Sequence, residues 1–187
     1  MPATQVIVVP RWGGTAADDW YPWLGGVLAA RGIEFQALDL PDPAVPRVEP
    51  WVRTVESAIL AEPAPAHLVV VGHSVGCRAL LAALERLPEA TRVAGALLVA
   101  AWWTIDETWP EAVPWEALRH DAGRIRAVAG RPVVLLSDDD PFTAGWEENR
   151  RLWEAGRDAD VRVHPGAAHF NAPREPAVLA AVLELAR

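Results

Sequence analysis

The chain has 187 residues, of which 51% are hydrophobic and 22% charged, and its formal net charge at pH 7 is −8. This size and composition are typical of one soluble globular domain with a substantial core. The negative charge argues against binding to nucleic acid or to an anionic membrane surface, because either partner requires a basic face. The single cysteine, Cys77, excludes an internal disulfide and a cysteine-based metal site.

No apolar run approaches the length of a membrane span, and residues 1–5 lack the charged and apolar regions of a signal sequence. We therefore expect a cytoplasmic protein. All 17 basic residues are arginine, which together with the many alanines and prolines indicates a GC-rich bacterial genome.

Apolar runs typical of buried strands alternate along the chain with stretches in which apolar residues recur at helical spacing. The expected strands cover residues 5–9, 35–38, 68–71, 93–99, 133–137 and 161–163. The expected helices cover residues 18–31, 49–61, 77–87, 144–155 and 175–186. Residues 101–130 are irregular, rich in tryptophan and then helical. The alternation predicts one α/β domain over residues 1–187, with helices on both faces of a parallel sheet of about six strands.

The sequence Gly72-His73-Ser74-Val75-Gly76 stands between the third expected strand and the helix that follows it. This G-x-S-x-G pattern is typical of a nucleophile elbow, in which glycines make room for a sharp turn and the serine is held above the sheet. The pentapeptide alone occurs by chance in about one chain of this length in twenty. Its position between a buried strand and an apolar helix is much rarer, so Ser74 is the candidate nucleophile.

A serine hydroxyl needs a base to take its proton and an acid to orient that base. In α/β-hydrolases these groups follow in the order Ser, Asp or Glu, His, each after a strand. Here Asp138, Asp139 and Asp140 follow the fifth expected strand, and His169 follows the sixth. An aspartate cluster after a strand is often only a turn or a helix cap, and a histidine in a Gly/Ala loop is often a surface residue. The shared order favours a triad.

The other histidines are weaker candidates for the base. His73 lies inside the elbow and points away from the nucleophile, His67 opens the elbow strand, His120 lies in the irregular segment and His164 ends a strand. A metal site made from His164, His169 and the aspartates fits no ligand spacing well. We expect neither a metal nor a cofactor.

The oxyanion of the reaction needs backbone N–H donors. One should be the amide of Val75, the residue after the nucleophile. The other should come from the turn after the first strand, where Trp12 is the first choice and Arg11 the second, followed by Gly13-Gly14. The alternative is a plain glycine turn.

The chain resembles the retinoblastoma-binding protein nine / YdeN-type family of small serine hydrolases over nearly its whole length. The segments in register are Trp20-Tyr21-Pro22-Trp23-Leu24, Leu40-Pro41-Asp42-Pro43, the elbow, Asp139-Asp140-Pro141-Phe142 and His169-Phe170. The resemblance implies a reduced six-stranded hydrolase sheet without a lid domain, and Asp140 as the triad acid. Pro141 agrees with this choice, because it restricts Asp140 to extended backbone angles. Arg11 stands where the family usually has glycine. Natural substrates in the family are mostly unassigned, and the human relative is named for a protein partner.

Tryptophans near the elbow predict an aromatic pocket for an apolar acyl or aryl group. The pocket candidates are Trp12, Trp102, Trp103, Trp109 and Trp115. The alternative, a role in core packing, is favoured for Trp20, Trp23, Trp51 and Trp153. The roughly thirty residues between positions 101 and 130 are too few for a large cap, so a small and rather open pocket is expected.

Two functions of different classes follow from these residues. The first is a serine hydrolase that cleaves small carboxylic esters, or less often thioesters or amides, through an acyl-enzyme on Ser74. The second is a catalytically weak hydrolase-fold protein that binds a ligand or another protein. The presence of Ser74, Asp140 and His169 favours the first, and nothing in the residues indicates a protein partner.

Overall fold

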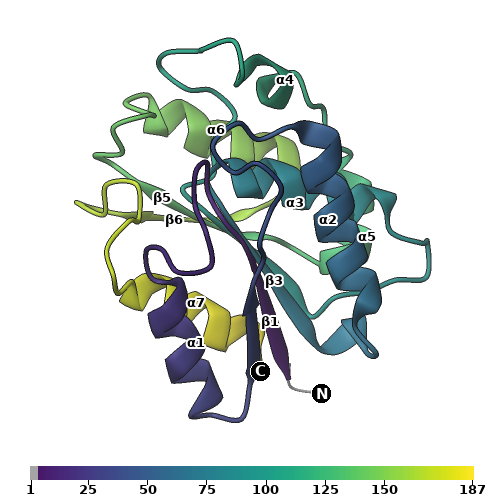
Figure 1. Ribbon diagram of the computed structural model, residues 1–187. Helices are drawn as coiled ribbons and strands as arrows, with labels where there is room; N and C mark the ends of the chain where they lie inside the picture. The colour runs from purple at the N-terminus through teal and green to yellow at the C-terminus, as the bar shows by residue number, and fades with distance from the viewer. Residues whose placement is uncertain (1–3) are drawn as a thin grey trace.

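The computed structural model describes residues 4–187, apart from the side chain of Arg157. Its centre is a sheet of six parallel strands in the order β2-β1-β3-β4-β5-β6 (Figure 1). The strands are β1 (Gln5–Val9), β2 (Glu34–Ala37), β3 (Leu68–His73), β4 (Gly95–Val99), β5 (Val133–Ser137) and β6 (Asp160–His164). The predicted α/β-hydrolase fold with a six-stranded parallel sheet is confirmed.

Helices cover both faces of this sheet (Figure 1). The helices are α1 (Tyr21–Ala29), α2 (Val48–Ala61), α3 (Val75–Arg86), α4 (Val113–Glu116), α5 (Ala122–Ala129), α6 (Trp146–Arg157) and α7 (Pro176–Leu185), with the 3-10 turn η1 (Pro65–His67) before β3. α1 and α7 pack on one face, while α2, α3, α5 and α6 pack on the other. No helix within residues 4–187 has the length and apolar character needed to cross a membrane.

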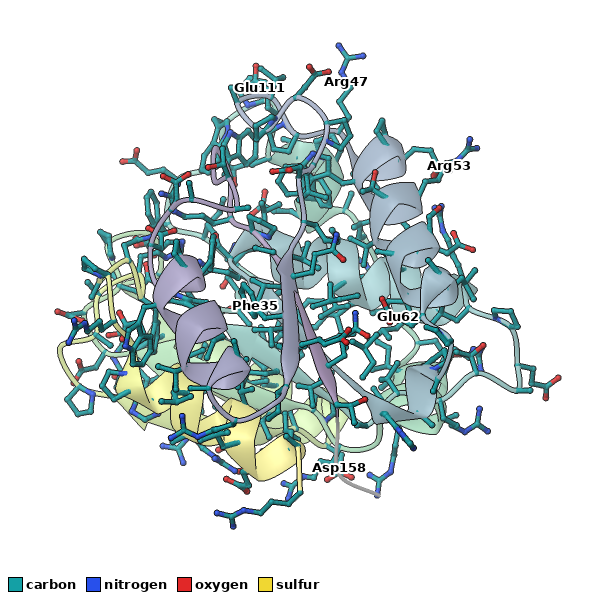
Figure 2. All side chains as sticks on the ribbon, turned by 60° about the horizontal axis from the view of Figure 1, so that its bottom comes forward. Phe35, Arg47, Arg53, Glu62, Glu111 and Asp158 are labelled. Atoms are coloured by element: carbon teal, nitrogen blue, oxygen red, sulfur yellow. The ribbon has the colours of Figure 1, made fainter. Side chains whose placement is uncertain are left out.

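The alternation of side chains along the strands explains why both faces need a cover. In β1, Ile7 and Val9 belong to the core on the α2–α3 side, whereas Val6 and Val8 belong to the core on the α1–α7 side. All four side chains are completely buried. Figure 2 shows the charged side chains of Arg53 and Asp158 projecting from the surface.

Several element boundaries differ from the sequence-based expectation by one to three residues, and two of these differences have clear local reasons. α1 begins at Tyr21 rather than at residue 18, because Asp18 accepts hydrogen bonds from Thr15 in a turn and Asp19 has a positive φ of 50°. β4 begins at Gly95 rather than at residue 93, because the Val93 amide donates to the Val128 carbonyl of α5 instead of to the neighbouring strand.

The segment after β4 contains only the single turn of α4 before α5, and it lies above the carboxyl ends of the strands (Figure 1). In parallel α/β sheets this edge is where ligands bind. The loops that follow β1, β3, β5 and β6 also leave the sheet at this edge. The fold therefore collects the residues that the sequence singles out for chemistry.

Candidate active site

Ser74 occupies a sharp turn between β3 and α3. Its φ is +55° and ψ is −123°, angles that a non-glycine residue rarely adopts. A Cβ on Gly72 would lie 2.6 Å from the Cys77 Cα, and a Cβ on Gly76 would lie 2.3 Å from the Val9 carbonyl oxygen. Glycine is required at both places because the elbow presses backbone against backbone. The Ser74 amide donates to the Val99 carbonyl at 2.8 Å, which ties the strained turn to β4.

His169 and Asp140 meet although they follow different strands. His169 Nδ1 lies 2.8 Å from Asp140 Oδ2, and both residues are buried. The other Asp140 oxygen, Oδ1, accepts the Phe142 amide at 2.9 Å, so the carboxylate is held on two sides. Because a carboxylate can only accept, His169 Nδ1 carries a proton and donates it to Asp140.

Ser74 and His169 line the same cavity. Within residues 4–187 no hydrogen bond joins the Ser74 hydroxyl to the His169 imidazole. Hydrogen bonds of this kind are often long in the free enzyme and tighten when substrate binds. The three side chains therefore have the order and burial that a serine nucleophile, its base and an orienting acid require.

Asp138 and Asp139 bind the backbone of the His169 loop rather than its imidazole. Asp138 Oδ1 accepts the Gly166 amide at 2.9 Å, and Asp139 Oδ1 accepts the Ala168 amide at 2.7 Å. The Ser137 hydroxyl also donates to Asp139 Oδ1, at 2.6 Å. The pKa of the Asp139 carboxyl is lowered, first by the Ser137 hydroxyl and then by the Ala168 amide. The aspartate cluster is thus a set of loop contacts with one member, Asp140, directed at the His169 imidazole.

The turn after β1 offers one backbone donor toward the site. The Arg11 amide donates to Tyr21 Oη at 3.2 Å, the Gly13 amide to the Pro43 carbonyl at 2.7 Å, and the Gly14 amide to the Arg11 carbonyl at 3.0 Å. Within residues 4–187 the Trp12 amide has no acceptor, and neither has the Val75 amide at the start of α3. Trp12 and Val75 both line the cavity. This supports Trp12 over Arg11 as the second oxyanion donor.

The cavity at Ser74 has a volume of about 330 Å³ and is mostly apolar. Besides Ser74, Val75 and His169, its walls are Trp12, Trp102, Ile105, Trp109 and Phe142, with Arg11 and Asn171 as polar members. Trp12 and Trp109 pack edge to face with ring centroids 5.1 Å apart. Trp109 and Phe142 are 37% and 47% exposed, so the aromatic wall reaches the surface.

The prediction that Trp103 and Trp115 line the pocket is wrong. Trp115 is completely buried, where its Nε1 donates to the Pro46 carbonyl at 3.1 Å and its ring packs against Trp51. Trp103 packs against the Trp153 ring, with centroids 4.7 Å apart. In an irregular segment the residue spacing does not reveal which tryptophans face the core.

A buried arginine explains how these tryptophans are held. Arg78 of α3 is 1% exposed, and its guanidinium lies 4.3 Å from the centre of the Trp103 ring. Its Nη2 donates to the Trp115 carbonyl at 2.8 Å and to the Leu118 carbonyl at 3.0 Å. Arg78 therefore connects α3, the helix after Ser74, to the segment that carries Trp102 and the outer cavity wall.

Sequence reasoning missed the cavity roles of Ile105, Phe142 and Asn171. Phe142 and Asn171 each stand two residues after a triad candidate, Asp140 and His169. Such proximity on the same loop is a signal that could have identified them. Within residues 4–187 no three His, Cys, Asp or Glu side chains converge as metal ligands.

Comparison with known proteins identifies the family of this chain. A sequence profile of the family described as "Serine hydrolase" matches residues 6–176. The chain belongs to the serine hydrolase family. This serine hydrolase is 31% identical over 142 residues to YdeN of Bacillus subtilis (strain 168), which is named as a hydrolase, and the match covers 74% of each chain. The predicted membership of the YdeN-type small serine hydrolases is confirmed.

Solved structures show the same fold. The crystal structure of the ydeN gene product from B. subtilis superposes on this serine hydrolase with a TM-score of 0.85 at 24% identity, over 98% of each chain. Est1E from Butyrivibrio proteoclasticus, solved with ferulic acid bound, gives a TM-score of 0.70 at 11% identity over 98% of this chain and 88% of its own. At these identities the likeness concerns the fold alone.

Proposed function

We propose that this serine hydrolase cleaves carboxylic esters of small acyl groups through an acyl-enzyme formed on Ser74. One observation carries the proposal: His169, bound to Asp140 at 2.8 Å, lines the same aromatic cavity as the elbow serine. Thioesters and amides would react at the same groups, with esters preferred because their alcohol leaving groups need less protonation than amines.

The acylation step follows from the proton positions. The Ser74 Oγ attacks the ester carbonyl carbon while His169 Nε2 takes the hydroxyl proton, and Asp140 stabilises the imidazolium that forms. The carbonyl oxygen becomes an oxyanion, for which the amides of Val75 and Trp12 are the proposed donors. The imidazolium then gives its proton to the leaving oxygen, the bond from carbon to that oxygen breaks, and the alcohol departs.

Deacylation repeats these steps with water. His169 Nε2 takes a proton from a water molecule, whose oxygen attacks the acyl carbon of the ester on Ser74. When the second tetrahedral intermediate collapses, the imidazolium returns the proton to Ser74 Oγ and the carboxylic acid leaves.

The cavity supports a substrate with a short or aromatic acyl group. A volume of about 330 Å³ lies at the lower end of the range for small-molecule sites. Flat indole and phenyl walls from Trp12, Trp109 and Phe142 match a planar or short apolar group. A long acyl chain would have to leave this cavity for solvent.

A fluorophosphonate probe tests the proposal, since it phosphonylates an activated serine. We expect one label per chain, located by peptide mass mapping at Ser74, no label in Ser74→Ala, and strongly slowed labelling in His169→Ala. Ser57→Ala is a control, because Ser57 is an exposed residue of α2 away from the cavity, and it should be labelled like the wild type. A wild-type protein that is not labelled, or is labelled elsewhere, favours a hydrolase fold used only for binding.

A further inference from the structure

A chain of buried polar groups lies behind the candidate active site. The Arg11 amide donates to Tyr21 Oη at 3.2 Å, Tyr21 Oη lies 2.7 Å from His73 Nδ1, and His73 Nε2 lies 2.9 Å from the His169 carbonyl oxygen. Tyr21 and His73 are both completely buried. The proposed function uses neither the Tyr21 nor the His73 side chain. These hydrogen bonds nevertheless connect the oxyanion turn to the backbone of the proposed base, His169.

The direction of each hydrogen bond in this chain is determined. A carbonyl oxygen can only accept, so His73 Nε2 must carry a proton and donate it to His169. Burial, and then the electrostatic influence of the neighbouring His169 side chain, lower the pKa of His73 well below its usual value, so the His73 imidazole is neutral and has one N–H. His73 Nδ1 therefore accepts, and the Tyr21 hydroxyl donates to it while accepting the Arg11 amide.

The His169 loop needs such support because its backbone is strained. Ala168 and Phe170, on either side of His169, both have positive φ angles, 45° and 53°. Each residue of the loop is held by a separate partner. Asp139 accepts the Ala168 amide at 2.7 Å, His73 donates to the His169 carbonyl, and Trp20 Nε1 donates to the Phe170 carbonyl at 3.0 Å. Strained angles at functional sites persist only where such contacts enforce them.

We propose that Tyr21 and His73 are positioning residues that hold the oxyanion turn and the base His169 at a fixed spacing across Ser74. The inference rests on the proposed function, since the groups that it positions are the Trp12 amide and the His169 imidazole. The peptide unit that follows Arg11 ends in the Trp12 amide, so a shift of the Arg11 backbone also moves that donor.

A second, more exposed connection joins the same two loops. Arg11 Nε donates to Asp19 Oδ2 at 2.7 Å, and Asn171 Nδ2 donates to Asp19 Oδ1 at 3.1 Å. Arg11 and Asn171 thus connect the oxyanion turn to the loop after His169 through the Asp19 carboxylate. Tyr21 and His73 in the inner connection are completely buried, so bulk water does not compete with the hydrogen bond between them.

Tyr21→Phe tests the inference because it removes only the hydroxyl and keeps the buried ring. We expect kcat on an activated ester to fall on the order of 10- to 100-fold while KM stays within about twofold, because misplacement of catalytic groups costs transition-state stabilisation alone. The rate of fluorophosphonate labelling at Ser74 should fall by the same factor. Circular dichroism and the melting temperature establish that the variant is folded.

Variants of His73 test the same link independently. His73→Leu should lose at least as much kcat as Tyr21→Phe, whereas His73→Gln, which keeps an N–H donor for the His169 carbonyl, should recover part of the loss. The double variant Tyr21→Phe/His73→Leu should be no slower than His73→Leu, because residues of one network are not additive. Nitrogen NMR of the histidines should show His73 as a neutral imidazole protonated at Nε2.

The outcomes separate three explanations. Ile59→Ala, a core substitution on α2, should lower the melting temperature but leave kcat within about twofold; an equal kcat loss there would make the effect of Tyr21→Phe a general loss of stability and overturn the inference. A wild-type kcat in Tyr21→Phe, a rise in KM alone, or His73 protonated at Nδ1 would also overturn it. Failure of the wild-type protein to label at Ser74 would instead overturn the proposed function.

Discussion

Asp140 contacts the imidazole of His169 at 2.8 Å, whereas the two aspartates before it accept backbone amides of the His169 loop. The difference follows from the loop after β5, in which Pro141 ends the run of aspartates and the Phe142 amide binds the second Asp140 oxygen. The three consecutive aspartates therefore make different contacts, and substitution of each one should have a different effect on activity.

We expect Asp140→Asn to lose on the order of 10²–10⁴ in kcat while it keeps its fold, because an amide in place of the carboxylate favours the wrong histidine tautomer. Asp138→Asn and Asp139→Asn should lose roughly tenfold at most, since each asparagine keeps an oxygen that can accept the loop amide. The measurement is kcat of all three variants on one activated ester, with circular dichroism as the check on folding. If Asp140→Asn kept nearly the wild-type kcat while Asp138→Asn or Asp139→Asn lost most of it, the acid would be assigned to the wrong residue.

The size of the cavity predicts the preferred acyl chain. In a series of p-nitrophenyl esters, kcat/KM should be highest for short acyl groups and fall as the chain lengthens beyond the Trp12–Trp109 wall. Trp109→Ala should move the optimum toward longer chains by opening this wall. Val113→Ala is the control, because Val113 lies in the same segment, is 51% exposed and does not line the cavity. A wild-type preference for long chains would be incompatible with this cavity.

The two kinds of glycine in the chain should respond oppositely to alanine. Gly76→Ala places a Cβ 2.3 Å from the Val9 carbonyl oxygen and 2.5 Å from the Pro10 carbonyl oxygen, so the elbow must open and stability should fall by about 1–3 kcal/mol or more. Gly26→Ala meets nothing within 4 Å on α1 and should stabilise the protein by about 0.5–1 kcal/mol. Urea denaturation of both variants measures the difference. If the two variants changed the free energy of unfolding equally, close backbone contact would not be the reason for glycine at position 76.

Replacement of the buried arginine tests how the outer cavity wall is held. Arg78→Lys cannot reproduce both the stacking on Trp103 and the bonds to the Trp115 and Leu118 carbonyls. We expect a loss of about 1.5–3 kcal/mol in the free energy of unfolding, the range for hydrogen bonds of charged groups, and a raised KM for ester substrates. Arg119→Lys, an exposed change on the same segment, should alter neither quantity. An unchanged stability of Arg78→Lys would show that the segment is held by its tryptophans alone.

The sequence by itself determined the fold, the elbow, and the order in which Ser74, Asp140 and His169 follow their strands along the chain. These features depend on local chemistry: the apolar runs of β1, β3 and β5 predict buried strands, and only a turn with glycine at positions 72 and 76 allows α3 to start one residue after Ser74. The family membership followed from segments that are also local. The sequence did not determine the exact ends of the elements. Val93, for example, is a residue type that favours strands, but its amide binds the Val128 carbonyl of helix α5, so β4 begins only at Gly95.

Only the tertiary structure decided which side chains face the cavity. Trp109 and Trp115 are both tryptophans of one irregular segment, yet Trp115 is buried because its indole N–H finds the Pro46 carbonyl, 69 positions away in the chain. In the same way His73 meets the carbonyl of His169 across 96 positions, which no spacing in the sequence reveals. Burial and hydrogen bonding between distant residues depend on how the layers pack, whereas strands, helices and turns are encoded by near neighbours.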